Sequence, residues 1–451
     1  GIALQDERQD YGGRVNASFK LFDDWLEVRP AVDYRQAARN NHYPNFQQAM
    51  RNNPTRSPYD PDSETGYNVW INESLDYNVV ADAMLEDYYG LDKWFKPEVN
   101  LKLNIKPIPG LNYQQVVGYE NRQWELHQYW PSTHRSEIDN SRKGHAHLAF
   151  SKTENLTSEG YFSYVKDFKG GHNLNATAGY SYFEVNGENF GMDNYNFSVD
   201  GIKYWDIGQG SYLTDGKAGM SSGKSVTERL FSFFARANYS YQDKYMLSAS
   251  IRHEGSSKFA ADNRWANFWS ATAGWRISNE EFMKDFDWLD DLKIRFGYGV
   301  TGNNDFSATY MANMLGSDTN WMMPNGTWAY SYGKSQNVNP NLGWEEKKEW
   351  NLGVDYSFFE GRLYGKFDYY RREVDNLLFS VKVPQPPYTQ GSQMQNIGSM
   401  ESKGWEFEVG GDIIRTKDFT WSSSMNLSHN TGKILTLEGD NSYHNGNGFV
   451  A

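Results

Sequence analysis

Three short motifs contain residue types that could do chemistry, and the first is a set of glycines. Gly297, Gly299 and Gly302 match the dinucleotide-binding spacing GxGxxG. That chemistry needs the glycines between a strand and a helix, so that the helix N-terminus meets a pyrophosphate. Here an Asn-Asn-Asp run follows at 303–305 without any helical period. The glycines therefore indicate a strand that runs into a loop.

The second and third motifs contain potential metal ligands. His145 and His147 would place two imidazoles on one face of a strand, but a third ligand is not apparent in the sequence. Asp60, Asp62 and Glu64 resemble a calcium loop, yet a threonine stands where an EF-hand needs glycine. A polar loop and a turn rich in Pro and Asp explain these motifs. No Ser/His/Asp set is evident either, so the sequence predicts no enzyme, no metal site and no cofactor.

The residues best suited to ligand binding are aromatic and lie in long polar segments. Flat aromatic faces stack on sugar rings, and neighbouring Asn, Asp, Gln and Arg side chains can hydrogen-bond hydroxyl groups; the same groups also bind peptides. For each residue, the alternative is that it packs loops together or contacts a partner protein. The candidate substrate-binding residues are Trp124, Tyr129, Trp130, Trp205, Trp321, Trp328 and Tyr330, with Tyr204 and Tyr388 in similar positions.

Alternating apolar and polar residues predict the elements that hold these segments. Between Phe231 and Glu254, every second residue is apolar, and the phase continues through a tight turn at 242–244. Such alternation is typical of β-strands with one apolar face. The pattern recurs along the chain and predicts about 14 strands, most of them long for a soluble sheet.

The predicted connections are alternately short and long. The short ones lie at 22–24, 106–110, 168–172, 242–244, 359–362 and 412–418, with one longer turn at 279–291. The long ones lie at about 35–96, 120–155, 184–226, 253–266, 300–349 and 373–403. A soluble sandwich has no reason to place all its long loops at one end of a sheet. Outer-membrane barrels do so, with short periplasmic turns and long extracellular loops.

Composition narrows the class of protein further. The 451 residues carry a net charge of -13, which argues against a nucleic-acid-binding protein. Aromatic residues make up 16% of the chain, so intrinsic disorder does not fit. Cysteine is absent, and no apolar run is long enough for a membrane-spanning helix. No segment near Gly1 has the features of a signal peptide.

The cost of burying charge in lipid favours the same fold. A Lys or Arg on the lipid face near the bilayer midplane costs ~2–4 kcal/mol. Mid-strand charges lie opposite the apolar series, at Arg236, Arg276, Lys293, Asp355 and Lys366. Three tyrosines flank the turn at 242–244, where an interfacial aromatic girdle would lie. The predicted fold is a transmembrane antiparallel β-barrel; the alternative is a large soluble antiparallel protein with one wet face.

Several segments resemble the SusC/RagA-type TonB-dependent transporters of Bacteroidota outer membranes. They read RHEGSSKFAADNRWANFWSATAGWRIS (252–278), LKIRFGYGVTGNN (292–304), NPNLGWEEKKEWNLGVDYSFFEGRLYGKFDYYRREVDNLL (339–378) and NIGSMESKGWEFEVGG (396–411). The loop NNPTRSPYDPDSETGYN (52–68) is also similar. Two departures are mild: Phe268-Trp269-Ser270 replaces Phe-Pro-Ser, and Glu254-Gly255-Ser256 replaces Asp-Gly-Ser.

The resemblance implies active import of a bulky nutrient across the outer membrane. In this family a plug domain and a TonB box precede a barrel of some 22 strands. We therefore expect residues 1–451 to form a partial β-barrel domain, with the plug, the TonB box and the closing strands outside this sequence. The expected partners are a SusD-like surface lipoprotein, TonB acting through the N-terminal region, and outer-membrane lipid.

The resemblance leaves the cargo open. Oligosaccharide import is the first hypothesis, because most members of the family serve glycan uptake, and oligopeptide import is the second. A passive porin and a surface adhesin barrel are alternatives from other classes. An outer-membrane hydrolase would need paired acidic and His residues at the rim, which the sequence does not bring together.

Overall fold

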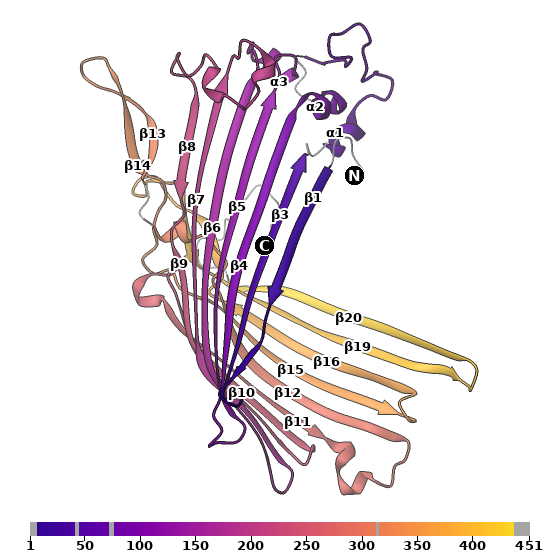
Figure 1. Ribbon diagram of the computed structural model, residues 1–451. Helices are drawn as coiled ribbons and strands as arrows, with labels where there is room; N and C mark the ends of the chain where they lie inside the picture. Colours follow the sequence, from indigo (N-terminus) through magenta and orange to yellow (C-terminus); the bar gives the residue numbers. More distant parts are fainter. Residues whose placement is uncertain (1–6, 41–44, 72–75, 313–314, 437–451) are drawn as a thin grey trace.

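The computed structural model describes residues 7–40, 45–71, 76–312 and 315–436, apart from the side chains of 317–320 and 330. One large antiparallel sheet dominates the described part of the chain. Along its path, each strand pairs with the next strand in the sequence or with the next one after a short side strand or a separate hairpin. Figure 1 shows the first strands standing upright side by side and the later strands fanning away from them.

Fourteen strands form this path, which confirms the predicted number. They are β1 (Glu7–Asn16), β3 (Leu26–Asn40), β4 (Asp87–Asn104), β5 (Leu111–Trp130), β6 (His145–Phe168), β7 (His172–Tyr195), β9 (Glu228–Tyr241), β10 (Tyr245–Ser256), β11 (Trp265–Arg276), β12 (Leu289–Asn303), β15 (Glu345–Phe358), β16 (Leu363–Asp375), β19 (Ser399–Arg415) and β20 (Thr420–Thr436).

The remaining elements are short and lie in the connections. Two side strands join the sheet, β2 (Phe19–Leu21) on β3 and β8 (Gly219–Lys224) on β7. Two separate hairpins are β13 (Leu315–Met322) with β14 (Trp328–Lys334), and β17 (Leu378–Lys382) with β18 (Ser392–Asn396). The helices are α1 (Phe46–Arg51), α2 (Val79–Leu85) and α3 (Arg135–Asp139), with 3-10 turns η1 (Asp200–Ile202), η2 (Ile207–Gln209), η3 (Ala261–Asn263), η4 (Ile277–Asn279), η5 (Glu281–Met283) and η6 (Ala308–Met311).

None of the described helices has the length and apolar character needed to cross a membrane.

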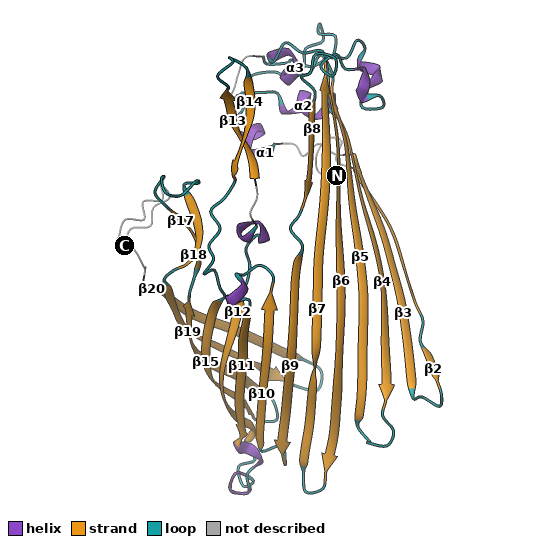
Figure 2. Ribbon diagram, turned by 90° about the vertical axis from the view of Figure 1, so that its left-hand side faces the viewer, coloured by secondary structure: helices purple, strands orange, loops and turns teal. Residues whose placement is uncertain are grey.

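The short and long connections lie at opposite ends of the strands, as predicted. Helices α1, α2 and α3 and the β13–β14 hairpin lie at the upper end in Figure 2, while the tight turns lie at the lower end. The longer turn that replaces a tight one contains η4 and η5. By the general rule for outer-membrane barrels, the lower end is periplasmic and the upper end extracellular.

The two faces of the sheet differ as the alternation predicted. In the register of β10, β11 and β12, Ile251 lies opposite Trp269, and Leu247 and Phe296 lie opposite Ala273. These side chains belong to the face that a bilayer would cover, and Ile251, Trp269 and Phe296 are about half exposed in the isolated chain. The opposite, polar face is concave where β7 to β12 meet, so it is the luminal face.

Strand length divides the sheet into two parts. The tall wall is β4 to β7, whose strands have 18, 20, 24 and 24 residues. The low wall is β9 to β12 with β15 and β16, whose strands have 12 to 15 residues. A tilted membrane strand needs only about 9–11 residues. The tall wall therefore extends well above the membrane, and the low wall does not.

This difference corrects several predicted loops. Much of 120–155 is the upper part of β5 and β6, leaving a connection only at 131–144. The predicted loop at 184–226 contains the end of β7 and all of β8, and the one at 35–96 contains the ends of β3 and β4. Above the lipid, both faces of a strand meet water, so the alternation that marks a membrane strand disappears. The loops at 300–349 and 373–403 also contain the two separate hairpins.

Candidate functional site

Three of the predicted binding residues lie on a strand of the tall wall and not in a loop. Trp124, Tyr129 and Trp130 all belong to the upper part of β5. Trp124 and Trp130 share the luminal side of β5, whereas Tyr129 points to the other side because neighbouring strand residues alternate. Only two of the three are therefore placed to meet a molecule inside the mouth.

Trp130 is part of a row of stacked rings across three strands. Its ring centroid lies 4.5 Å from that of His145, which in turn lies 4.2 Å from that of Tyr195. The guanidinium of Arg142 lies 4.5 Å from the Tyr195 ring. The sequence alone could not show the row, because Trp130 and Tyr195 are 65 positions apart.

The two histidines of the suspected metal motif share a carboxylate. His145 Nε2 and His147 Nδ1 each lie 2.8 Å from Asp193 Oδ1 on β7. In the described residues, no group of three or more His, Cys, Asp or Glu side chains is arranged to hold a metal ion. The shared hydrogen bonds instead fix the His145 ring within the aromatic row.

Tyr129 is a packing residue. Its side chain is 1% exposed, and its hydroxyl donates a 2.8 Å hydrogen bond to Asp200 in the connection between β7 and β8. Phe197 packs edge-on against its ring at 5.6 Å. Asp200 also accepts hydrogen bonds from the backbone N–H and hydroxyl of Ser132. Tyr129 therefore ties two extracellular connections to the top of the tall wall.

Tyr204 and Trp205 follow in the same connection and differ in exposure. Tyr204 is buried, with its ring 5.3 Å from that of His127. Burial, followed by the charge of Asp87, raises the pKa of the Tyr204 hydroxyl above its ordinary value. The Trp205 side chain is 76% exposed. Tyr204 thus anchors the connection and presents Trp205 to the outside.

The remaining candidates lie elsewhere on the extracellular side. Trp321 and Trp328 belong to the β13–β14 hairpin and are 67% and 65% exposed. The backbone of Tyr330 is in β14, but its side chain lies outside the described part of the structure. Tyr388 is half-buried in the connection that contains the β17–β18 hairpin. The predicted residues therefore occupy separate surfaces and do not converge on one pocket.

The other two motifs have structural explanations. Gly302 is the second-last residue of β12 and lies against the Phe268 ring, since a Cβ added there would lie 2.1 Å from Phe268 Cζ. This close approach accounts for the glycine, and the strand-to-loop prediction is confirmed. The Asp60 carboxylate accepts a hydrogen bond from the Asp62 backbone, within a turn closed by the Tyr59–Tyr67 bridge.

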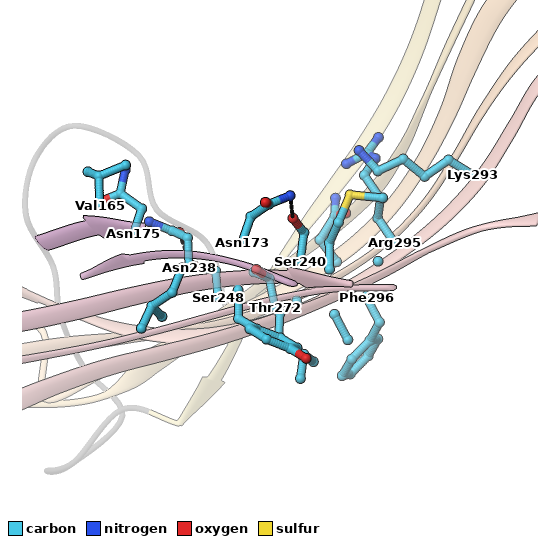
Figure 3. Close-up of a pocket in the computed structure, with 18 of the residues that line it drawn as sticks. Val165, Asn173, Asn175, Asn238, Ser240, Ser248, Thr272, Lys293, Arg295 and Phe296 are labelled. Atoms are coloured by element: carbon cyan, nitrogen blue, oxygen red, sulfur yellow. Dashed lines mark hydrogen bonds between the residues drawn. The ribbon is translucent and has the colours of Figure 1, made fainter. Parts of the chain in front are cut away.

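A groove on the luminal face near the periplasmic end was not predicted (Figure 3). It has a volume of about 560 Å³, and small polar side chains form much of its lining, including Asn173, Asn175, Asn238, Ser240, Ser248 and Thr272. Lys293 and Arg295 lie at one side, and Figure 3 shows Phe296 extending to the opposite side of the same strand. The groove is formed by seven different strands, so no local motif could mark it.

The basic side of the groove belongs to an ion-pair network. Arg295 makes two 2.8 Å hydrogen bonds to Asp355 and a 3.2 Å bond to Asp368. Lys293 lies 3.9 Å from the same Asp355 carboxylate. Lys293 and Asp355 are two of the mid-strand charges that the sequence placed opposite the apolar series. Because they pair with each other on the luminal face, the lipid face remains free of them.

A wall with a lipid face, a polar lumen, short turns at one end and long connections at the other defines an outer-membrane β-barrel. The chain matches the family model described as "TonB dependent receptor-like, beta-barrel" over residues 24–449. The chain therefore belongs to this family, which is one of receptors and transporters and not of enzymes. Its location is the outer membrane.

Curated relatives support the SusC/RagA type. "TonB-dependent receptor P39" of Formosa agariphila is 32% identical over 357 residues, which cover 76% of this chain and 32% of that protein. "TonB-dependent receptor SusC" of Bacteroides thetaiotaomicron is 39% identical over 236 residues, covering 51% of this chain and 23% of that protein. The chain thus spans about a quarter to a third of these two relatives.

Solved structures support the fold. The "Structure of the RagAB peptide transporter" superposes with a TM-score of 0.80 at 22% identity, covering 95% of this chain and 47% of that chain. The siderophore receptor PiuA of Acinetobacter baumannii superposes less closely, with a TM-score of 0.51 at 11% identity over 95% of this chain and 57% of that chain. The predicted resemblance to the SusC/RagA type is confirmed.

Proposed function

We propose that this chain forms part of the barrel wall of a TonB-dependent transporter that imports a bulky nutrient. The first hypothesis for this nutrient is an oligosaccharide. The outer membrane holds no ATP, so the energy comes from the inner-membrane proton gradient through TonB. TonB acts on a plug that fills the lumen, and the proposal assigns the plug and the TonB contact to parts of the protein outside this sequence. The barrel supplies a rigid wall and part of the binding surface.

The single observation that carries the proposal is the extension of the tall wall above the membrane. Its luminal side presents Trp124 and the ring row that begins at Trp130, together with the amide and hydroxyl groups of the same strands. Rings and neutral hydrogen-bonding groups suit a carbohydrate. A passive porin needs neither a tall rim nor a ring-lined mouth, which supports an importer over a pore.

The exposed apolar residues of the β13–β14 hairpin support a protein partner. Leu315, Met322, Trp328 and Tyr332 lie on one face of the hairpin and are 58% to 71% exposed. A soluble surface rarely carries such a contiguous apolar patch unless something covers it. The proposed partner is a SusD-like surface lipoprotein that closes the mouth as a lid.

Oligopeptide import is the second candidate. It is favoured by the fold similarity to the RagAB peptide transporter. An adhesin or structural barrel is a third class, distinguished by the absence of TonB-dependent uptake.

The test uses the full-length gene expressed with its neighbouring lipoprotein in cells with and without TonB. Uptake of fluorescent oligosaccharides should require TonB and the plug, whereas deletion of the plug should leave only passive leakage. A panel of oligosaccharides and oligopeptides against the purified complex then identifies the cargo. Uptake that persists without TonB, or failure of every oligosaccharide and oligopeptide to bind, would overturn the proposal.

A further inference from the structure

Where β3 meets the tall wall, the luminal face of the sheet holds a tryptophan between two arginines. Arg35 on β3, Trp94 on β4 and Arg122 on β5 are direct neighbours in one row across the sheet. The guanidinium carbons of Arg35 and Arg122 lie 5.2 Å and 4.9 Å from the centre of the Trp94 ring. These distances are within the range of cation–π contacts, so the indole orders both guanidinium groups.

The surrounding rows make this part of the lumen basic. The row above contains Asp10, Asp92 and Trp124, and the next row contains Arg8 and Arg39. Four arginines thus share three rows with two aspartates, in a chain whose net charge is -13. This part of the lumen therefore carries a positive charge, although the chain as a whole is negative.

The aspartates use only some of the hydrogen-bond donors of Arg35 and Arg122. Asp92 is only 4% exposed and lies 3.3 Å from Arg122 and 3.6 Å from Arg39. Arg35 donates two hydrogen bonds to Asp10, and Arg122 donates one to Asp92, of the five N–H groups that each guanidinium carries. Both arginine side chains remain about half exposed, at 49% and 51%.

The row lies at the level where the lumen opens into the mouth. On the outer face, the step below it carries Tyr34 and Phe95, level with Glu154 on β6, and the step above it carries Lys93 and Lys152. The change from apolar to charged residues marks the upper edge of the lipid, which lies one step lower on β6 than on β3 and β4. A molecule that entered through the mouth would pass the row on its way into the lumen.

We propose that Arg35, Trp94 and Arg122 form a binding site for the carboxylate groups of an acidic oligosaccharide. This inference rests on the proposed import function and names the class of its cargo. A stacked guanidinium keeps its N–H edge free for bidentate contact with a carboxylate. Because the two arginines are two strands apart, about 10 Å separates them, which suits a ligand with two spaced carboxylates.

The groups around the row favour a saccharide over an acidic peptide. The half-buried Trp124 provides a ring in the next row. Thr153 and Ser151 continue the two rows onto β6 with hydroxyl groups. Rings and hydroxyls of this kind match the faces and hydroxyl groups of sugar rings, which peptide cargo lacks.

The test compares the full-length transporter and its lipoprotein with the R35Q/R122Q variant, using trigalacturonate, maltotriose and triglutamate as probes. The wild-type complex should bind trigalacturonate most tightly, and the double variant should lose about tenfold to a hundredfold of that affinity because charged hydrogen bonds disappear. The R35K/R122K variant, which keeps the charge but loses the fork geometry, should lose less. Higher salt should weaken wild-type binding of trigalacturonate.

The matched control is R29Q. Arg29 lies on the same face of the same strand, is 53% exposed and pairs with Glu27, but it lies three rows away from Arg35. R29Q should bind trigalacturonate as the wild type does, and all variants should insert into the membrane with the same heat-modifiable mobility. Equal binding by R35Q/R122Q and R29Q, or tighter wild-type binding of triglutamate, would overturn the inference. If the wild-type transporter took up maltotriose but not trigalacturonate in a TonB-dependent manner, the acidic-oligosaccharide site would be overturned and the import function would stand. If the wild-type transporter showed no TonB-dependent uptake of any probe, both the site and the import function would be overturned.

Discussion

The tall wall and the low wall cross the same membrane with the same alternation, but only the tall wall continues above it. In the low wall, the outward residues stay apolar almost to the strand ends, as at Ile251 and Trp269. In the tall wall, the outward residues change from Leu156 to Glu154 and Lys152 within one strand. The comparison shows that lipid restricts the outward residues of a strand only where the strand crosses the membrane. The part of a strand above the membrane can carry residues that bind a ligand.

The largest expected effect tests the lipid part of the comparison. Phe296→Arg places a charge in the middle of the apolar face of the low wall, where Leu352 and Ala273 are its neighbours. We expect the free energy of unfolding to fall by ~2–4 kcal/mol. Urea unfolding in lipid vesicles measures it.

The matched control is Phe190→Arg, on the outer face of β7 above the lipid. Phe190 is 47% exposed and stacks on Phe150 at 5.2 Å. Only part of one aromatic contact is lost there, so we expect a cost below about 1 kcal/mol. Equal costs for the two substitutions would show that the membrane boundary on the tall wall has been placed wrongly.

The second effect tests how the tall wall holds its connections. Asp200→Ala removes the acceptor of three hydrogen bonds, from the Tyr129 hydroxyl and from the Ser132 hydroxyl and backbone. Buried donors left without an acceptor cost about 1–3 kcal/mol. Hydrogen exchange should accelerate in 131–144 and 196–218, while Tyr129→Phe should show a smaller increase. Unchanged exchange in both variants would contradict the anchoring role of Tyr129.

The third effect concerns the periplasmic end of the low wall. Glu280, in the turn between β11 and β12, accepts hydrogen bonds from Tyr245, Trp275 and Lys244. These bonds, that of Tyr245 foremost, lower the pKa of the Glu280 carboxyl below its usual 4.5. Because the folded pKa is the lower one, the stabilisation is complete above pH 4.5 and is lost as pH falls through the folded value.

The protection of the amides in the two turns at 242–244 and 277–288, taken as the exchange rate corrected for its intrinsic pH dependence, should therefore fall in acid. In Glu280→Gln this protection should already be lower at neutral pH and should change little on acidification. A Glu280→Gln variant with the wild-type pH profile would assign the effect to another carboxylate. Exchange in the tall wall serves as the internal reference.

The smallest effect on stability is expected at the exposed extracellular tryptophans. Trp205→Ala and Trp328→Ala remove side chains that are 76% and 65% exposed, so unfolding should change by less than about 0.5 kcal/mol. Association with the surface lipoprotein should weaken for Trp328→Ala, measured by co-purification. A loss of stability comparable to that of Phe296→Arg would show that the β13–β14 hairpin packs on the barrel.

Sequence patterns predicted the membrane part of each strand well. The turn at 242–244 and the residues around it are as expected, because lipid on one face and water on the other impose a period of two. The same patterns predict loops where the upper strands lie, since water on both faces of a strand leaves no period of two. Of the candidate site residues, Trp124 and Trp130 lie on the luminal face, while Tyr129 is buried packing.

The sequence by itself determined the number of strands along the path of the main sheet, the sides of that sheet and the family. These follow from local alternation and from segments that are contiguous in the chain. Only the tertiary structure decided which residues meet, as when β6 and β7 bring His145 and His147 to Asp193 or β3 and β5 enclose Trp94. Such contacts depend on strand register, which is set by the length of every strand and turn that lies between the two residues. The physical reason is that a sheet joins distant segments of the chain by hydrogen bonds between strands. The pattern within one segment shows that it is a strand but does not show which residues of another strand lie beside it.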